Sequence, residues 1–184
     1  MNILSTYDPR QGLPSASAFE RLALCPGSFM MEKACPEESS PAASEGTLLH
    51  AYMEQLLTGE PWEGTPLTAE QVERCERALR LLDGVKEMIE RDNPGAVFHL
   101  GSTEQRLFYR NLFGTAYYSG QWDALFEVNC PDSSFMMVAD WKFGRVEVDS
   151  AEANRQLEAL VPLVAQKEHD DYVVHQGIYA AIIQ

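Results

Sequence analysis

The sequence predicts an α/β fold, with a central mixed β-sheet flanked by helices. Apolar residues recur at helical spacing through the first half of the chain, and this pattern stops at the turn sequence Asn93-Pro94-Gly95. Short alternating or apolar segments follow, and a helical segment separates the last of them from the others. With 184 residues, of which 45% are hydrophobic, the chain is expected to form one structural domain. Residues 1–95 would be a helical region packed on a core made by residues 96–184.

In the helical region, helix starts are predicted from capping residues. A first helix is expected near Ala18, with Ser15 or Ser17 as its N-cap. Residues 35–44 are expected to form a loop because they contain few apolar side chains. Ser44 is then expected to cap the next helix, and Thr68 to cap a long amphipathic helix through a capping box.

In the second half, strands are predicted at residues 96–100, 102–109, 120–128, 135–139 and 178–183. A helix is expected from Ser150 or Ala151 to about Gln166, with a kink or break at Pro162 because proline removes a helical hydrogen bond. Val146 to Val148 is expected to be extended. The chain stops on an apolar run, so we expect it to be truncated at or near a domain edge.

The strongest chemical signal is Asp140-Trp141-Lys142, which follows the apolar strand 135–139. Strand alternation places Asp140 and Lys142 on one face and Trp141 on the other. An acid and a base at the mouth of a buried strand are costly unless they pair or bind a ligand. The turn sequence at residues 129–134 predicts a hairpin that brings Asp123 close to Asp140. Two carboxylates and a lysine are donors suited to a magnesium-type site that binds phosphate.

These residues belong to a series of five short motifs in a defined order. The motifs are Gly46-Thr47-Leu48-Leu49-His50, an acidic residue at Glu104, Gly120-Gln121-Trp122-Asp123, Asp140-Trp141-Lys142, and Gln156 followed by Leu160. The series resembles the PD-(D/E)XK nuclease superfamily, and more closely its RecB-like exonuclease branch. Leu160 departs from the branch, which has Tyr at this position. The run from Ser15 to Ser28, followed by Glu45-Gly46-Thr47, is similar to a phage and prophage group within the branch.

The resemblance implies a Mg²⁺ or Mn²⁺ ion held by Asp123, Asp140 and the backbone carbonyl of Trp141. It also implies that His50 approaches the metal from a helix, and nitrogen ligation would favour Mn²⁺. One ion or two are both compatible with this set of residues.

The resemblance assigns the remaining residues to the substrate side of the site. Lys142 would contact the phosphate and the attacking water, Glu104 would position water or bind a second metal, and Gln156 would hydrogen-bond substrate or water. Each residue also has a structural interpretation. Asp140 and Lys142 could form a strand-end ion pair, His50 could be a structural histidine, and Glu104 could face solvent.

The cysteines do not predict a cluster. Cys25 matches the first iron–sulfur ligand of some RecB-like relatives, but no cysteine follows Cys130, so we expect no iron–sulfur cluster in this chain. The four cysteines show no short paired spacing, which favours reduced thiols and a cytoplasmic location. The sequence contains neither a signal peptide nor an apolar run long enough for a membrane span, so we expect no membrane association.

The net charge of −14 is unusual for a nucleic-acid-binding protein. We therefore expect weak DNA binding or a partner, such as a phage recombination protein, that delivers the substrate. The favoured function is a metal-dependent deoxyribonuclease, exonuclease-like, in phage recombination or DNA processing. Two alternatives remain open: a catalytically inactive binding or assembly module that keeps the fold, and an enzyme acting on a small phosphorylated substrate.

Overall fold

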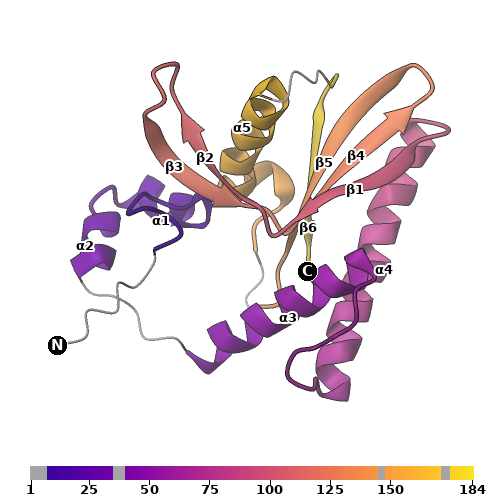
Figure 1. Ribbon diagram of the computed structural model, residues 1–184, viewed down its shortest axis with the longest axis horizontal. Helices are drawn as coiled ribbons and strands as arrows, with labels where there is room; N and C mark the ends of the chain where they lie inside the picture. Colours follow the sequence, from indigo (N-terminus) through magenta and orange to yellow (C-terminus); the bar gives the residue numbers. More distant parts are fainter. Residues whose placement is uncertain (1–7, 35–39, 145–147, 171–174) are drawn as a thin grey trace.

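The computed structural model describes residues 8–34, 40–144, 148–170 and 175–184. Its centre is a four-stranded mixed sheet in the order β1-β4-β5-β6 (Figure 1). β1 pairs antiparallel with β4, β4 antiparallel with β5, and β6 parallel with β5. The strands are β1 (Val97–Thr103), β4 (Ala124–Cys130), β5 (Ser133–Trp141) and β6 (Ile178–Ile183). The predicted fold class, the hairpin between the Asp123 and Asp140 segments and the last strand are confirmed.

Helices cover both faces of this sheet. Helices α3 (Pro41–Thr58) and α4 (Ala69–Asp92) pack on one face, where Phe126 and Met137 meet Leu49 and Leu82. Helix α5 (Arg155–Asp170) packs on the other face. The residues buried in that second cluster include Leu125, Val138, Leu157, Leu160 and Leu163. Successive residues of β4 and β5 alternate between the two clusters, as expected for a sheet buried on both sides.

The start of α3 differs from the prediction. The helix begins at Pro41, and the Ser40 hydroxyl accepts a hydrogen bond from the Ala43 amide at 3.1 Å. Ser44 therefore lies in the first turn, so the prediction that it caps the helix was wrong. Proline at the first helical position has the required φ and lacks only an amide that would be unpaired there. Of the predicted loop at 35–44, residues 35–39 lie outside the described part of the chain, and residues 41–44 are helical.

The capping box at Thr68 is confirmed. The Thr68 hydroxyl accepts from the Gln71 amide at 3.3 Å, and the Gln71 side chain accepts from the Thr68 amide at 2.9 Å. The predicted side-chain cap by Ser15 or Ser17 is not formed. A short 3₁₀ turn, η1 (Ala16–Ala18), precedes α1 (Phe19–Leu24), and the Ser17 hydroxyl instead pairs with that of Ser15 at 3.0 Å. Helix α2 (Ser28–Ala34) follows.

A β-hairpin projects from the sheet as a separate two-stranded arm made of β2 (Arg106–Arg110) and β3 (Ala116–Gln121) (Figure 1). The sequence predicted continuous strands at 102–109 and 120–128, but both are interrupted, between β1 and β2 and between β3 and β4. Cross-strand hydrogen bonds continue through the interruption: the Glu104 amide donates to the Asp123 carbonyl at 3.1 Å, and the Trp122 amide donates to the Gln105 carbonyl at 3.4 Å. One long ribbon is therefore bent where Glu104 and Asp123 face each other.

Gly120 allows this arm to lie against α5. A Cβ at this position would overlap Leu163 Cδ1 and lie 2.8 Å from Leu160 Cδ2. Both leucines are fully buried, so they have little room to move. The glycine of the Gly-x-x-Asp motif therefore has a packing role beside the site.

We expect Gly120→Ala to destabilise the protein by about 1–3 kcal/mol because overpacking forces side chains off their rotamers. The measurement is the free energy of urea unfolding. Gly84→Ala is the matched control, since no atom lies within 4 Å of a Cβ built there, and it should gain up to about 1 kcal/mol from helix propensity. A Gly120→Ala protein as stable as the wild type would contradict this role.

Helix α5 starts and ends later than predicted. Residues 151–153 form a 3₁₀ turn, η2 (Ala151–Ala153), and the Asn154 side chain caps α5 by accepting from the Leu157 amide at 3.0 Å. The helix runs through Pro162 to Asp170, so of the predicted kink or break the break was wrong, and the kink stays a prediction. Buried Leu160 and Leu163 on either side of the proline supply packing that offsets the lost hydrogen bond. The predicted extended piece at 146–148 lies largely outside the described residues.

Candidate active site

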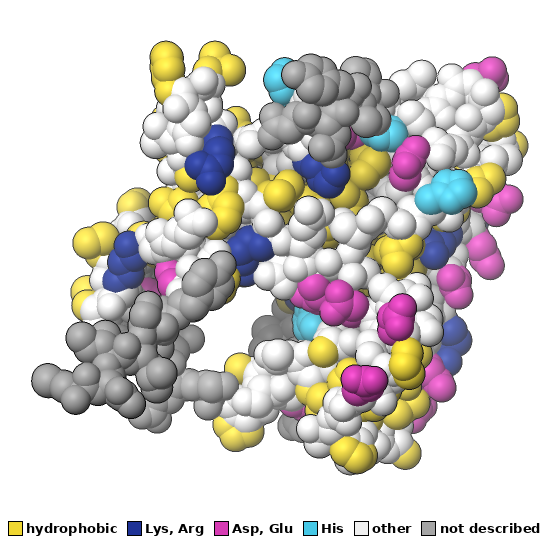
Figure 2. Space-filling view, in the orientation of Figure 1, with side chains coloured by type: hydrophobic (Ala, Val, Ile, Leu, Met, Phe, Trp, Pro, Cys, Tyr) yellow, Lys and Arg dark blue, Asp and Glu magenta, His cyan; other side chains and the backbone are white. Residues whose placement is uncertain are grey.

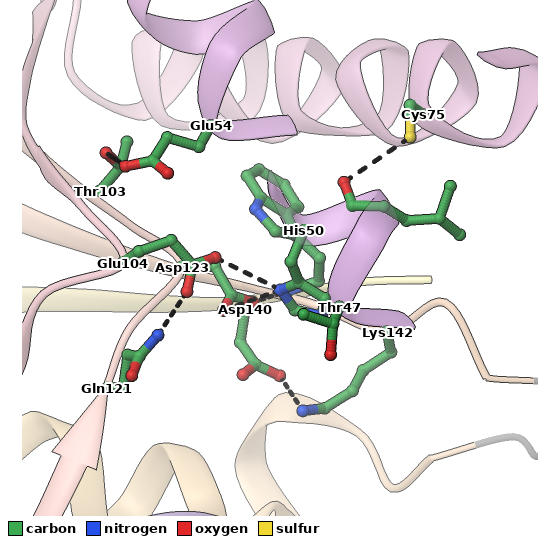
Figure 3. A network of polar contacts seen from close by, with 12 residues as sticks. Thr47, His50, Glu54, Cys75, Thr103, Glu104, Gln121, Asp123, Asp140 and Lys142 are labelled. Carbon is green, nitrogen blue, oxygen red and sulfur yellow. Dashed lines mark hydrogen bonds and ion pairs between the residues drawn. The ribbon is translucent and has the colours of Figure 1, made fainter. Parts of the chain in front are cut away.

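The bend of the ribbon, the end of β5 and the helices α3 and α5 meet at one place (Figure 3). The structure brings together there the side chains of His50 from α3, Glu104 from the β1–β2 interruption, Asp123 from the β3–β4 interruption, Asp140 from β5, Lys142 just after β5, and Gln156 from α5. Trp141 contributes its backbone, and its side chain is buried in the core. All the residues selected from the sequence are therefore neighbours.

His50, Glu104 and Asp123 form the tightest group. Nδ1 of His50 lies 3.1 Å from Oδ1 of Asp123 and 3.5 Å from Oε1 of Glu104. One ligand atom from each of the three residues lies within 4.8 Å of the others. Two carboxylates and an imidazole at this spacing are a donor set that a divalent cation can bind.

The position of Glu104 depends on the bend. Its φ is 46°, a left-handed conformation that costs a non-glycine residue about 1 kcal/mol or more. The predicted continuous strand at 102–109 would have included Glu104, and this was wrong because β1 ends at Thr103 and β2 begins at Arg106. The turned backbone points Glu104 toward His50, and Gln121 Nε2 donates to Glu104 Oε2 at 2.5 Å.

Asp123 connects the trio to the end of β5. Its Oδ2 accepts a hydrogen bond from the Trp141 amide at 2.5 Å, and only 7% of the residue is exposed. This bond leaves Oδ1 facing His50. The proposed ligand role of the Trp141 carbonyl stays a prediction.

Asp140, Lys142 and Gln156 form a second group, in which each side chain contacts the other two. Lys142 Nζ lies 2.5 Å from Asp140 Oδ2 and donates to Gln156 Oε1 at 2.9 Å, while Gln156 Nε2 donates to Asp140 Oδ1 at 2.5 Å. The ion pair considered from the sequence therefore exists, and Gln156 completes it. Leu160 is fully buried, so the residue that departs from the motif packs in the core. The metal-ligand role of Asp140 stays a prediction.

The two groups influence each other electrostatically. Burial opposes the charged form of His50, but the carboxylates of Asp123 and Glu104 outweigh burial and raise the pKa of His50 to about 10. Burial raises the pKa of Asp140, with the charge of Asp123 acting in the same direction and Lys142 opposing it. Without metal, a proton on His50 therefore balances the acids of the trio.

Residues 12–184 match the family described as protein of unknown function (DUF2800). The chain belongs to the DUF2800 family. The match includes every residue of both groups, so the site lies within the part of the chain that defines family membership. No curated protein matches the chain. No helix in the described parts of this DUF2800 chain is long and apolar enough to cross a membrane.

Lys142 is reachable from solvent in this DUF2800 protein. A cavity of about 850 Å³ is lined by His50, Arg74, Lys142 and Phe143 together with the first turns of α3. A second cavity of about 280 Å³ reaches Lys142 and Gln156 from the α5 side. Two cavities that could hold a ligand therefore border Lys142.

Sequence reasoning missed two residues that support the site. Gln121 holds Glu104, and its period-two spacing from Asp123 was an available signal. Arg74 on α4 donates to the Phe143 carbonyl and pairs with Glu45 at 3.2 Å. Arg74 had no local signal, because an exposed arginine on an amphipathic helix is ordinary and its partner lies far away in the sequence.

We expect the stability of the metal-free protein to depend on His50 in alkaline solution. The pKa of His50 rises from 6.5 in the unfolded chain to about 10 in the folded protein. Protonation therefore stabilises the fold fully below pH 6.5, and this contribution is lost as pH rises through 10. It should amount to a few kcal/mol at most. Chelator-treated wild type and His50→Gln should differ in urea unfolding at pH 6 and converge above pH 10; a constant difference would contradict this linkage.

Proposed function

We propose that the chain is a divalent-metal-dependent deoxyribonuclease of the RecB-like type within the PD-(D/E)XK superfamily. The observation that carries the proposal is the meeting of His50, Glu104 and Asp123 beside Lys142 at the end of β5. These residues come from four separated segments, which makes their convergence hard to explain by one local structural need. The sheet of three antiparallel strands and a parallel fourth strand after a helix also agrees with that superfamily.

The residues present fit Mg²⁺ or Mn²⁺. The donors of the trio are mainly carboxylate oxygens, which suit hard divalent cations, and the imidazole adds the nitrogen that Mn²⁺ tolerates. Oε1 of Glu104 is buried and accepts no hydrogen bond from any described residue, and it lies 3.5 Å from Nδ1 of His50. Such an atom has unused capacity as a ligand. His50 would lose its Nδ1 proton when a cation binds, since the proton and the cation compete for the same lone pair.

When bound, a divalent cation would withdraw charge from the phosphate oxygens and ease proton loss from the attacking water. Lys142 would donate hydrogen bonds to a phosphate oxygen and balance the charge that develops there. Gln156 would position Lys142 and Asp140 through its two side-chain hydrogen bonds. Asp140 would keep the ammonium group aimed at the phosphate. The acidic chain as a whole favours delivery of DNA by a partner, such as a phage recombination protein.

The test is hydrolysis of labelled linear DNA with Mg²⁺ or Mn²⁺. We expect degradation that stops with chelator and is lost in Asp140→Ala. Glu158→Ala is the control, because this acid on α5 is exposed and pairs with Arg155 at 3.0 Å, so its loss should leave the rate unchanged. Comparison with free nucleotides separates DNA from a small phosphorylated substrate. Activity that ignores both metal and the Asp140 substitution would reject the proposal.

The second candidate is a catalytically inactive binding or assembly module. The observation favouring it is that protonated His50 and Lys142 already pair with the acids of the site, so the network is balanced without an ion. This candidate predicts no binding of Mn²⁺ at millimolar concentration. Calorimetric titration of the wild type against Asp123→Ala distinguishes the two candidates.

A further inference from the structure

The β2–β3 arm ends in two apolar side chains that are almost completely exposed. Leu112 is 100% exposed and Phe113 is 92% exposed. Tyr109 and Tyr117 are also exposed near them. Figure 2 shows hydrophobic side chains gathered at the tip of the arm, away from the body of the protein. Exposed apolar groups of this size at one place typically mark a binding surface.

The tip is an ordered turn. The Asn111 amide donates to the Thr115 carbonyl at 3.0 Å, and the Gly114 amide donates to the Asn111 carbonyl at 2.9 Å. Oδ1 of Asn111 accepts from the amides of Phe113 and Thr115, each at 2.9 Å. Gly114 supplies the positive φ of 80° that the turn requires. Leu112 and Phe113 are therefore held outward by the backbone of a defined turn.

The arm is also fixed to α5. The Arg110 amide donates to Oε1 of Gln166 at 2.9 Å, and the Tyr118 hydroxyl donates to the Ala159 carbonyl at 2.9 Å. The rings of Tyr109 and Tyr118 stack with centroids 5.2 Å apart. Since α5 also carries Gln156, the arm and the candidate site share one support.

The charge of the arm differs from that of the rest of the chain. Residues 105–122 contain no acidic residue, although the chain has 28, and this is its longest stretch without Asp or Glu. The same residues include Arg106 and Arg110, and Arg110 lies over the Phe108 ring at 5.5 Å. In a protein of net charge −14, this is a segment that a polyanion can approach without meeting carboxylates on the segment itself.

The arm is continuous with the candidate site, because β2 begins two residues after Glu104 and β3 ends two residues before Asp123. At about 3.3 Å per strand residue, the tip lies roughly 25 Å along the ribbon from the trio. We propose that the arm binds DNA, with Phe113 stacking on an unpaired base, Leu112 in apolar contact beside it and Arg110 facing the backbone. Stacking on aromatic side chains is tolerant of sequence, as a nuclease without base-specific contacts requires. This inference rests on the proposed function for the identity of its ligand.

The experiment measures binding of a labelled single-stranded oligonucleotide by fluorescence anisotropy. It uses the full chain with Lys142→Met, so that the strand is not degraded, in Mg²⁺ and again in EDTA. Adding Leu112→Ser and Phe113→Ser should weaken binding at least about tenfold, consistent with loss of base stacking. Met30→Ser with Met31→Ser on α2 is the matched control, since these adjacent methionines are also exposed, and it should not change binding.

Equal binding by the arm variant and its parent, or no binding by the parent, would overturn the proposal. Loss of a dimer in sedimentation by the arm variant, without a change in oligonucleotide binding, would overturn it in favour of contact between two copies. Metal-dependent hydrolysis by the wild type with arm-independent binding would leave the nuclease proposal standing. Arm-dependent binding without hydrolysis by the wild type would support the arm as a DNA-binding surface and reject the nuclease proposal.

Discussion

Replacement of Lys142 by Met should lower the rate of DNA hydrolysis by about a hundredfold to a thousandfold while Mn²⁺ still binds. A single donor that stabilises transition-state charge is worth about that much. Lys142 contacts Asp140 and Gln156, whereas the tightest group of ligand atoms is made by His50, Glu104 and Asp123. The measurements are single-turnover hydrolysis of linear DNA and calorimetric titration with Mn²⁺.

Folding of the Lys142→Met protein must also be checked. Asp140 is only 1% exposed, and the substitution removes the ammonium group that pairs with its carboxylate. We expect it to unfold more readily than the wild type in urea, by about 3–5 kcal/mol if Asp140 stays charged and less if Asp140 takes up a proton. Lys33→Met is the control for removal of a lysine charge, since Lys33 is exposed on α2, a helix that contributes no residue to the site. Loss of metal binding in parallel with activity would show that Lys142 supports the metal site and not the phosphate.

Replacement of Asp123 by Asn should abolish both metal binding and hydrolysis. Asn has the shape of Asp, but its single carbonyl oxygen must accept the hydrogen bond from the Trp141 amide. The amide nitrogen then faces His50, where it offers no lone pair to a cation. We expect Mn²⁺ affinity to fall at least about a hundredfold and hydrolysis to become undetectable. Calorimetry and the DNA assay measure the two effects.

Asp8→Asn is a control for this substitution, since Asp8 is an acid near the N-terminus that caps a surface turn through the amides of Arg10 and Gly12. It should leave Mn²⁺ affinity unchanged. An Asp123→Asn protein that binds Mn²⁺ as tightly as the wild type would place the cation elsewhere.

Much of the fold follows from local patterns. The Thr68 capping box, the apolar run at 135–139 and the last strand each depend on signals within a few residues, so they could be predicted. The N-cap of α3 shows where such signals become ambiguous. Ser44 was predicted as the cap, but Ser40 is the cap in the structure, and serines are frequent in this part of the sequence. Pro41 at the first helical position decides between them.

The bend at Glu104 could not be predicted in the same way. Alternation between residues 102 and 109 is compatible with one strand. The interruption lies opposite Trp122, which is completely buried between β3 and β4 and whose indole donates to Ser102 at 3.0 Å. The contact between Trp122 and Ser102 joins residues on either side of the β2–β3 hairpin, which are far apart in the sequence. The side-chain direction of Glu104, and therefore the composition of the trio, depends on tertiary packing that no short window of sequence contains.

The order of motifs carried more information about the site than any single residue. Asp123, Asp140 and Lys142 could be placed together because a turn joins their strands. His50 and Gln156 were brought in through the resemblance, since they lie on helices whose packing the pattern alone does not fix. Gln121 occupies a position that the Gly-x-x-Asp motif leaves unspecified, and Arg74 lies outside the motifs, so the roles of both were found only in the structure.

The most direct test is a crystal structure of the protein with Mn²⁺, in which anomalous scattering locates the ion. We predict one manganese bound by His50 Nδ1, Glu104 Oε1 and Asp123 Oδ1, with Lys142 beside it and free to meet a phosphate. A structure that contains manganese elsewhere, or one that keeps the His50–Asp123 contact with no ion at saturating Mn²⁺, would contradict the account.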